Sequence, residues 1–199
     1  MRSIEDAVAA TRNALRYLTR GESIISGVLR YLRPLTLRQR VVALRTLVKP
    51  VADELMHSWK ELCIGLNNIP QDVTVCVDEE SLRQVFEELF GNAVQARNGS
   101  GIIRVHASFI QMTQDNGRLV PAARLVVEDD GPGVPSQLVD RLFEPFVTGS
   151  AQGTGLGLAF VKRVIEEHGG FIKYEPVVPH GVRFIFVLPA VLEEHVNGA

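Results

Sequence analysis

The chain has 199 residues, 46% of them hydrophobic, and a formal net charge of −2 at pH 7. It is long enough to bury a core and should hold one globular domain plus an appendage. No apolar run approaches the roughly 18–20 residues of a membrane span. The N-terminus also lacks the apolar segment of an export signal, so we expect a soluble, cytoplasmic protein without membrane contact.

The first quarter of the chain is basic and the remainder is acidic. Residues 1–49 hold ten Lys and Arg against three Asp and Glu, a charge of +7, which leaves −9 for the other residues. A basic arm can bind nucleic acid, but only Tyr17 and Tyr31 add aromatic rings to it, and no DNA-reading motif is present. We therefore expect no nucleic-acid partner.

Residues 3–32 follow a heptad pattern that predicts one long helix. Seven of the nine positions along one seam are apolar, which favours a coiled coil or helical bundle. The arginines, Arg30 among them, fall outside the seam, and most should face solvent. Pro34 ends the helix, so residues 1–34 are predicted to be a helical dimerisation or linker segment. The seam comprises Ile4, Val8, Thr11, Leu15, Leu18, Glu22, Ile25, Leu29 and Leu32.

Strands and helices alternate from residue 39 onward. His57, on the first of these helices, is interpreted as structural. Cys63 and Cys76 stand in apolar stretches, which favours buried free thiols over a disulfide and argues against a zinc site. The predicted elements are a strand at 41–44, a helix at 47–59, strands at 63–66 and 73–77 around a turn at 67–70, and a helix at 79–98.

The helix predicted at 79–98 has an apolar stripe and a polar stripe. Asp78 or Ser81 is expected to cap its first turn. The polar stripe, turned roughly 100° from the apolar one, is formed by Glu88, Asn92 and Gln95 at helical spacing. The apolar stripe is Leu82, Phe86, Leu89, Ala93 and Ala96.

Two glycine-rich stretches follow. A strand pair at 102–110 and 118–127 ends in Asp129, and the glycines at 131 and 133 allow the backbone to approach a flat ligand. Gly153, Gly155 and Gly157 then open a helix that runs to residue 168. Glycines before a helix leave backbone N–H groups free, which favours a phosphate site at the positive end of the helix dipole. Strands at 171–174 and 182–189 and a polar tail at 191–199 complete the chain.

In their order, these motifs resemble the catalytic ATP-binding domain of sensor histidine kinases, in the GHKL ATPase superfamily. The matching residues are Asn92-Ala93, Asp129-Asp130-Gly131-Pro132-Gly133, Phe143-Glu144-Pro145-Phe146 and Gly153-Thr154-Gly155-Leu156-Gly157-Leu158, and the likeness covers about residues 36–189. With the alternation of elements, it implies a two-layer α/β sandwich of the Bergerat type, with a mixed, mainly antiparallel sheet preceded by one long helix. The catalytic domain is predicted at 35–190.

The resemblance implies Mg-ATP as the ligand. Asn92 aligns with the family's magnesium asparagine, Asp129 should accept the adenine amino group, and Val134 should pack on the ring. Glu88 departs from the asparagine of many such kinases and acts either as a base or by orienting Asn92 or a metal-bound water. The predicted ATP contacts are Asn92, Gln95, Ala96, Asp129, Gly131, Gly133, Val134, Phe146, Thr148, Gly153, Thr154, Gly155, Leu156, Gly157 and Leu158.

Few cations accompany this predicted site. Gln95 replaces the family's frequent lysine, and residues 144–154, the predicted lid, contain no Lys or Arg. Arg97 and Lys162 are the remaining candidates for a phosphate contact.

Three functions remain open. The leading one is a protein-histidine kinase that forms a homodimer through the N-terminal helix, phosphorylates a histidine on a helix absent from this chain, and relays phosphate to a response regulator. The alternatives are a GHKL ATPase or serine-directed regulatory kinase, which Glu88 favours, and a non-enzymatic nucleotide-sensing dimeriser.

Overall fold

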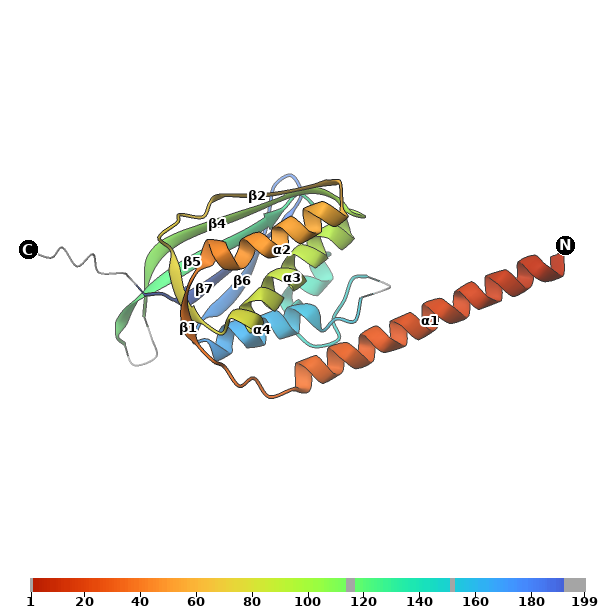
Figure 1. The fold of residues 1–199 in the computed structure, drawn as a ribbon, viewed down its shortest axis with the longest axis horizontal. Helices are drawn as coiled ribbons and strands as arrows, with labels where there is room; N and C mark the ends of the chain where they lie inside the picture. The colour runs from red at the N-terminus through yellow and green to blue at the C-terminus, as the bar shows by residue number, and fades with distance from the viewer. Residues whose placement is uncertain (1, 114–116, 151–152, 192–199) are drawn as a thin grey trace, which may run out of the picture.

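A computed structural model describes residues 2–113, 117–150 and 153–191, so most of the predicted polar tail lies outside the described residues. The main body has two layers, with helices covering one face of a five-stranded sheet (Figure 1). These helices are α2 (Leu44–Ser58), α3 (Glu79–Ala96) and α4 (Gly157–Glu167). The α/β sandwich expected from the sequence is confirmed.

The sheet is mixed and mainly antiparallel. Its order is β2-β4-β5-β7-β6, and only the β2–β4 pair is parallel. The strands are β2 (Glu61–Asn68), β4 (Ser100–Thr113), β5 (Leu119–Asp129), β6 (Phe171–Pro176) and β7 (Val182–Pro189). A separate antiparallel pair joins β1 (Arg40–Ala43) to β3 (Thr74–Val77). The two strands on either side of the turn at 67–70 therefore pair with different, distant strands.

The core lies between the sheet and its helices. Phe86 and Phe90 of α3 are fully buried, and the Phe86 ring lies 5.9 Å from the ring of Phe186 on β7. Leu125 and Val127 face the same layer from β5. Four members of the apolar stripe predicted on α3 are thus buried in the core, which fixes the direction of its polar stripe, whereas the fifth, Ala96, is exposed and lies at the end of the helix.

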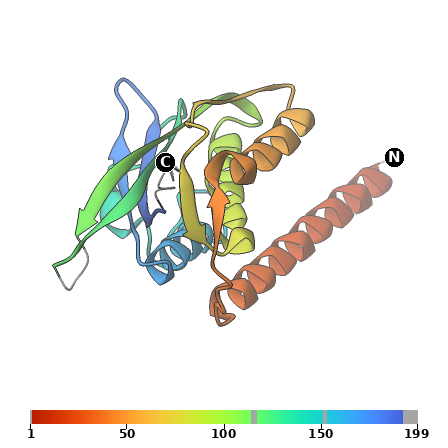
Figure 2. The same cartoon turned by 60° about the vertical axis from the view of Figure 1, so that its left-hand side comes forward.

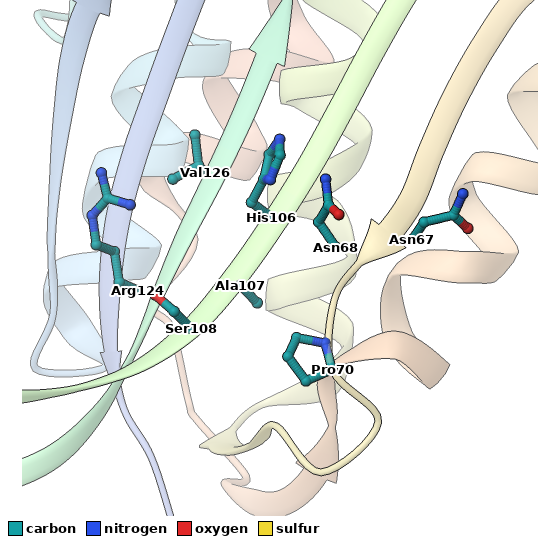
Figure 3. Close-up of a pocket in the computed structure, with 8 residues that line it drawn as sticks. All are labelled: Asn67, Asn68, Pro70, His106, Ala107, Ser108, Arg124 and Val126. Carbon is teal, nitrogen blue, oxygen red and sulfur yellow. The ribbon is translucent and has the colours of Figure 1, made fainter.

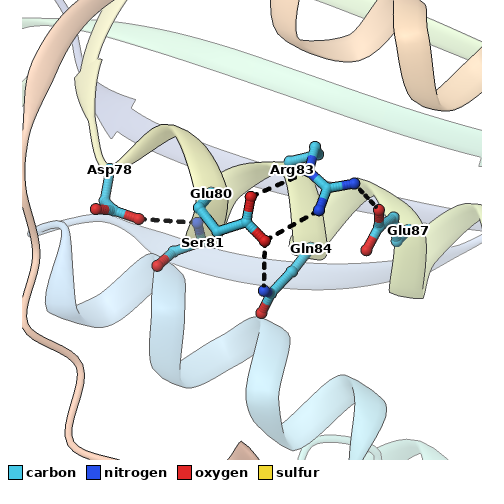
Figure 4. A network of polar contacts seen from close by, with 6 residues as sticks. All are labelled: Asp78, Glu80, Ser81, Arg83, Gln84 and Glu87. Carbon is cyan, nitrogen blue, oxygen red and sulfur yellow. Dashed lines mark hydrogen bonds and ion pairs between the residues drawn. The ribbon is translucent and has the colours of Figure 1, made fainter.

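Asp78 ties the start of α3 to the end of α4. Its side chain accepts a hydrogen bond from the Ser81 amide at 2.9 Å (Figure 4), and its own amide donates to Nε2 of buried His168 at 2.9 Å. The His168 Nδ1–H therefore donates to the Val164 carbonyl, 2.7 Å away. Burial raises the pKa of Asp78, but hydrogen bonds from the Ser81 and Arg38 backbones outweigh it, and the pKa is lowered.

The cysteines do not follow the prediction. They are free thiols, but Cys63 is exposed and Cys76 is only half-buried, so the expected burial is wrong. The reason is the two-residue period of a strand: Leu62 and Ile64 of β2 turn into the core, which leaves Cys63 on the opposite face of an edge strand.

The sheet face away from the helices carries polar side chains. Glu128 accepts a hydrogen bond from Arg183 at 2.6 Å and lies 3.6 Å from Arg104. Beside this cluster is a groove of about 440 Å³ over β2, β4 and β5 (Figure 3). None of the predicted site residues lines it. Its lining is Asn67, Asn68, Pro70, His106, Ala107, Ser108, Arg124 and Val126.

Helix α1 (Arg2–Leu32) extends away from the body, and only its C-terminal end lies against α4 (Figures 1 and 2). Leu15, Leu18 and Leu29 of its predicted seam are 64–66% exposed. No helix among the described residues is both long enough and apolar enough to cross a membrane.

Candidate functional site

A cavity of about 660 Å³ opens between α3, the ends of β5 and β7, and the glycine-rich start of α4. Its size is typical of a small-molecule site. It gathers most of the predicted site residues from segments far apart in the chain: Glu88, Asn92, Gln95, Ala96, Asp129, Gly133, Val134, Thr148, Gly153, Thr154, Gly155, Gly157 and Leu158.

Asp129 supplies a buried carboxylate where β5 ends. The side chain is 9% exposed, and its Oδ1 accepts the Gly131 amide at 2.8 Å. Burial raises the pKa of Asp129, against the opposing effect of hydrogen bonds from the backbones of Gly131 and Val182. Each carboxylate oxygen has a second lone pair, so the group can still accept a donor such as an exocyclic amine.

Helix α3 presents its polar stripe to the cavity. Glu88, Asn92 and Gln95 all line it, as their helical spacing predicts. Glu88 is the member closest to α4, because a Cβ added at Gly157 would lie 2.2 Å from its Oε2. Only glycine fits at position 157 while Glu88 keeps this position.

Two residues with positive φ lie near the two ends of the predicted lid, residues 144–154. Phe146 has a φ of 67° and Gly155 one of +68°, and the Phe146 amide donates to the Gly155 carbonyl at 2.8 Å. A Cβ at Gly155 would come within 2.4 Å of the Phe146 carbonyl carbon. Glycine is thus required where the lid returns to α4.

Three predicted contacts lie outside the cavity lining. The Phe146 side chain is 65% exposed, so this residue shapes the lid through its backbone. Leu156 is buried and faces Gly27 of α1. Gly131 acts through its amide on Asp129.

The walls of the cavity include residues that sequence reasoning missed. Leu138 and Leu142 come from the short 3-10 helix η1 (Ser136–Arg141) and the residue after it, and Phe184 comes from β7. The i, i+4 spacing of the two leucines was the available signal. Pro135, Val147 and Gly149 are further additions, and Pro132, Ser150 and Val182 also line the cavity.

No Lys or Arg lines the cavity in the described part of the chain. The two candidate cations have other partners: Arg97 lies 3.7 Å from Asp130, and Lys162 lies 3.7 Å from Glu166. Arg30, expected to face solvent like the other arginines of α1, instead forms an ion pair with Glu88.

The donor set fits a magnesium ion that also contacts phosphate. Asn92 offers an amide oxygen to the metal, and the carboxylate of Glu88, one turn earlier on the same face of α3, also lines the cavity. Mg²⁺ prefers oxygen ligands and is commonly held by one or two protein groups together with substrate phosphates.

Comparison with known proteins identifies relatives of this site. A family model described as histidine kinase-, DNA gyrase B-, and HSP90-like ATPase matches residues 77–192. The chain is 38% identical over 122 residues to the sensory histidine kinase/phosphatase NtrB of Rhodobacter capsulatus, which covers 59% of this chain and 34% of that protein. It spans about a third of the length of the curated relatives it matches.

Two solved structures are similar in fold. Full-length ShkA in complex with AMPPNP has a TM-score of 0.67 and 29% identity, with 94% of this chain and 39% of that chain covered. The histidine kinase ThkA in complex with the response regulator protein TrrA has a TM-score of 0.66 and 28% identity, with 89% and 49% covered.

Proposed function

We propose, given that this chain belongs to the histidine kinase-, DNA gyrase B-, and HSP90-like ATPase family, that it is the ATP-binding catalytic part of a cytoplasmic sensor histidine kinase. The observation that carries the proposal is one cavity with a buried carboxylate, Asp129, at one side and glycine-rich backbone at the start of α4 at the other. An adenine amino group suits the first and a phosphate chain suits the second.

Each part of the site has a separate task. Asp129 accepts the adenine amino group, and Val134 and Leu142 enclose the ring. Asn92 would hold Mg²⁺ and Glu88 would orient Asn92 or a metal-bound water; the ion would supply counter-charge to the triphosphate. The backbone amides at the start of α4 and the hydroxyl of Thr154 bind phosphate oxygens.

The reaction is transfer of the γ-phosphoryl group to an imidazole. The lone pair of a neutral imidazole nitrogen attacks the γ-phosphorus, a P–N bond forms, the bond from the γ-phosphorus to the β,γ-bridging oxygen breaks, and ADP leaves. None of the described histidines, His57, His106, His168 and His180, lines the cavity. The proposal places the acceptor histidine outside this segment, and a response regulator takes the phosphoryl group onward. This partner is supported by the ThkA complex.

The seam of α1 supports a homodimer. Its apolar residues from Val8 to Leu32 are exposed in the single chain, and a second copy of the same helix covers them by coiled-coil packing. Dimerisation also brings this catalytic segment close to the acceptor helix of the same or the partner chain.

ATP hydrolysis is the second candidate function, favoured by Glu88 beside Gly157. A glutamate can take a proton from an attacking water, and removal of such a base typically slows turnover about 10²–10⁴-fold. Its ion pair with Arg30 argues for the kinase, because the guanidinium already engages one oxygen of the carboxylate.

The test is phosphoryl transfer from labelled ATP to a histidine-bearing helix added in trans, with mass spectrometry locating an acid-labile phosphate. Asp129→Ala should bind ATP about 10–100-fold more weakly, since a hydrogen bond to a charged group contributes about 1.5–3 kcal/mol. Phosphate release without an acceptor, lost in Glu88→Gln, would establish the ATPase. ATP binding without either reaction would establish a nucleotide-sensing dimeriser.

A further inference from the structure

The cavity is poor in positive charge for a triphosphate site. Among the described residues its lining contains no Lys or Arg, and it contains the carboxylate of Glu88 beside Gly157. A carboxylate there repels a polyphosphate unless another group neutralises it. The cation that does so comes from α1, outside the catalytic body.

Arg30 contacts the carboxylate of Glu88. Its Nη2 forms an ion pair with Glu88 Oε1, while Oε2 of the same carboxylate points to Gly157. The guanidinium carbon lies 4.9 Å from the centre of the Phe160 ring, a cation–π contact on the first turns of α4. The Arg30 Nε is buried and has no hydrogen-bond partner among the described residues. Arg30 is therefore held by one carboxylate and one ring.

The fit of α1 against α4 places Arg30 there. Gly27 is buried, and a Cβ at this position would lie 3.1 Å from Cδ1 of Leu156, so the two helices approach through a glycine. On the next turn Arg163 of α4 donates to the Tyr31 carbonyl and lies 5.8 Å from the Tyr31 ring. These contacts hold α1 in place without touching Glu88.

We propose, on the basis of the ATP site assigned above, that Arg30 is a positioning residue that couples the docking of α1 to triphosphate binding through Glu88. With α1 docked, Glu88 is neutralised and fixed, and the site binds polyphosphate tightly. With α1 undocked, the carboxylate is unpaired and repels it. Thermodynamic linkage requires the reverse effect as well, so bound Mg-ATP stabilises the docked helix.

The test compares calorimetric affinities for Mg-ATP and for adenosine. Arg30→Ala should weaken Mg-ATP binding about tenfold and leave adenosine unchanged, because only the phosphates meet Glu88. Arg30→Lys should recover most of the loss. Arg33→Ala, an exposed arginine at the same end of α1, is the matched control and should bind like the parent.

A double-mutant cycle separates the coupling from a structural role. In the Glu88→Gln background, Arg30→Ala should cause no further loss of Mg-ATP affinity, because no carboxylate charge remains to neutralise. Arg163→Ala weakens docking but keeps both charges, so its loss should be smaller than that of Arg30→Ala. Mg-ATP should also slow hydrogen exchange of the amides of residues 27–33 in the parent and not in Arg30→Ala.

Two results would overturn the inference: Arg30→Ala binding Mg-ATP like the parent, or the full tenfold loss persisting in the Glu88→Gln background. Failure of the ATP site itself looks different, since the parent would then bind neither adenosine nor Mg-ATP, or Asp129→Ala would bind both normally.

Discussion

Helices α1 and α3 are both amphipathic, yet only α3 buries its apolar stripe within this chain. Phe86 and Leu89 of α3 are at most 1% exposed, whereas Leu15 and Leu18 of α1 are 64% and 66% exposed. The pattern of α3 thus specifies packing on the chain's own sheet, and that of α1 leaves apolar side chains exposed in the single chain. An isolated helix gains too little from its own hydrogen bonds to be stable in water.

An ion pair joins the two helices. Arg30 of α1 pairs with Glu88 of α3 beside the start of α4. Helix α3 supplies side chains that line the cavity, whereas α1 contacts one of them, Glu88, from outside the cavity lining. Each prediction below changes one side of this contrast.

The largest effect is expected in the core of α3. Phe86→Ala removes a fully buried ring that lies 5.9 Å from Phe186, and it should lower the free energy of unfolding by about 3–5 kcal/mol. Urea denaturation measures it. Leu18→Ala on exposed α1 is the control and should change the unfolding of the body by less than about 0.5 kcal/mol. Equal losses would mean that both helices are packed alike.

A smaller change is expected when α1 loses its seam. Leu18→Glu places a charge where a partner helix packs, so the dissociation constant of the dimer should rise at least about tenfold while the body unfolds as before. Analytical ultracentrifugation measures it, with the exposed off-seam residue Tyr17 changed to Ser as control. A parent chain that is monomeric at high concentration contradicts the predicted interface.

The cap of α3 should contribute less. Asp78→Ala removes the acceptor of the Ser81 amide and should cost about 1 kcal/mol at neutral pH. Because the pKa of Asp78 is lowered in the folded protein, its contribution to stability is present at pH values above the ordinary pKa of 3.8. The contribution is lost as pH falls through the folded-state pKa. Thermal unfolding against pH tests it.

Glu80→Ala is the control for the cap. Glu80 accepts hydrogen bonds from Arg83 and Gln84 on the exposed side of the same turn (Figure 4). Exposed i, i+4 pairs of this kind typically contribute about 0.3–0.5 kcal/mol. Glu80→Ala should therefore lower the free energy of unfolding by about that amount. If Asp78→Ala lowers the free energy of unfolding no more than Glu80→Ala does, the capping role of Asp78 is refuted.

The smallest effect has the opposite sign. Burial raises the folded-state pKa of Asp129 above 3.8, so ionisation is less favourable in the folded protein. The free energy of unfolding therefore falls as pH rises through the window between 3.8 and the folded-state pKa. Asp129→Asn removes the charge and should unfold at a slightly higher temperature than the ligand-free parent at pH 7, with no gain below the window. A less stable variant at pH 7 would show that the carboxylate is needed for folding.

Much of the site could be predicted from the sequence because its signals are local. The spacing of Glu88, Asn92 and Gln95 places them on one helix face, and the structure directs that face into the cavity. Asp129 follows an apolar strand, and Gly153, Gly155 and Gly157 come just before a helical pattern, as they do in the structure at the start of α4. Each of these inferences depends on residues only a few positions apart.

Other features were decided by tertiary packing alone. β2 and β3 flank one turn yet join different sheets, because register and partner are set by strands far away in the chain. The exposure of Cys63 follows from that placement. The heptad correctly puts Arg30 off the seam, but nothing in it indicates Glu88, 58 positions later, as the partner. Periodicity determines which way a side chain leaves its own helix or strand; only the packing of separate elements determines what that side chain meets.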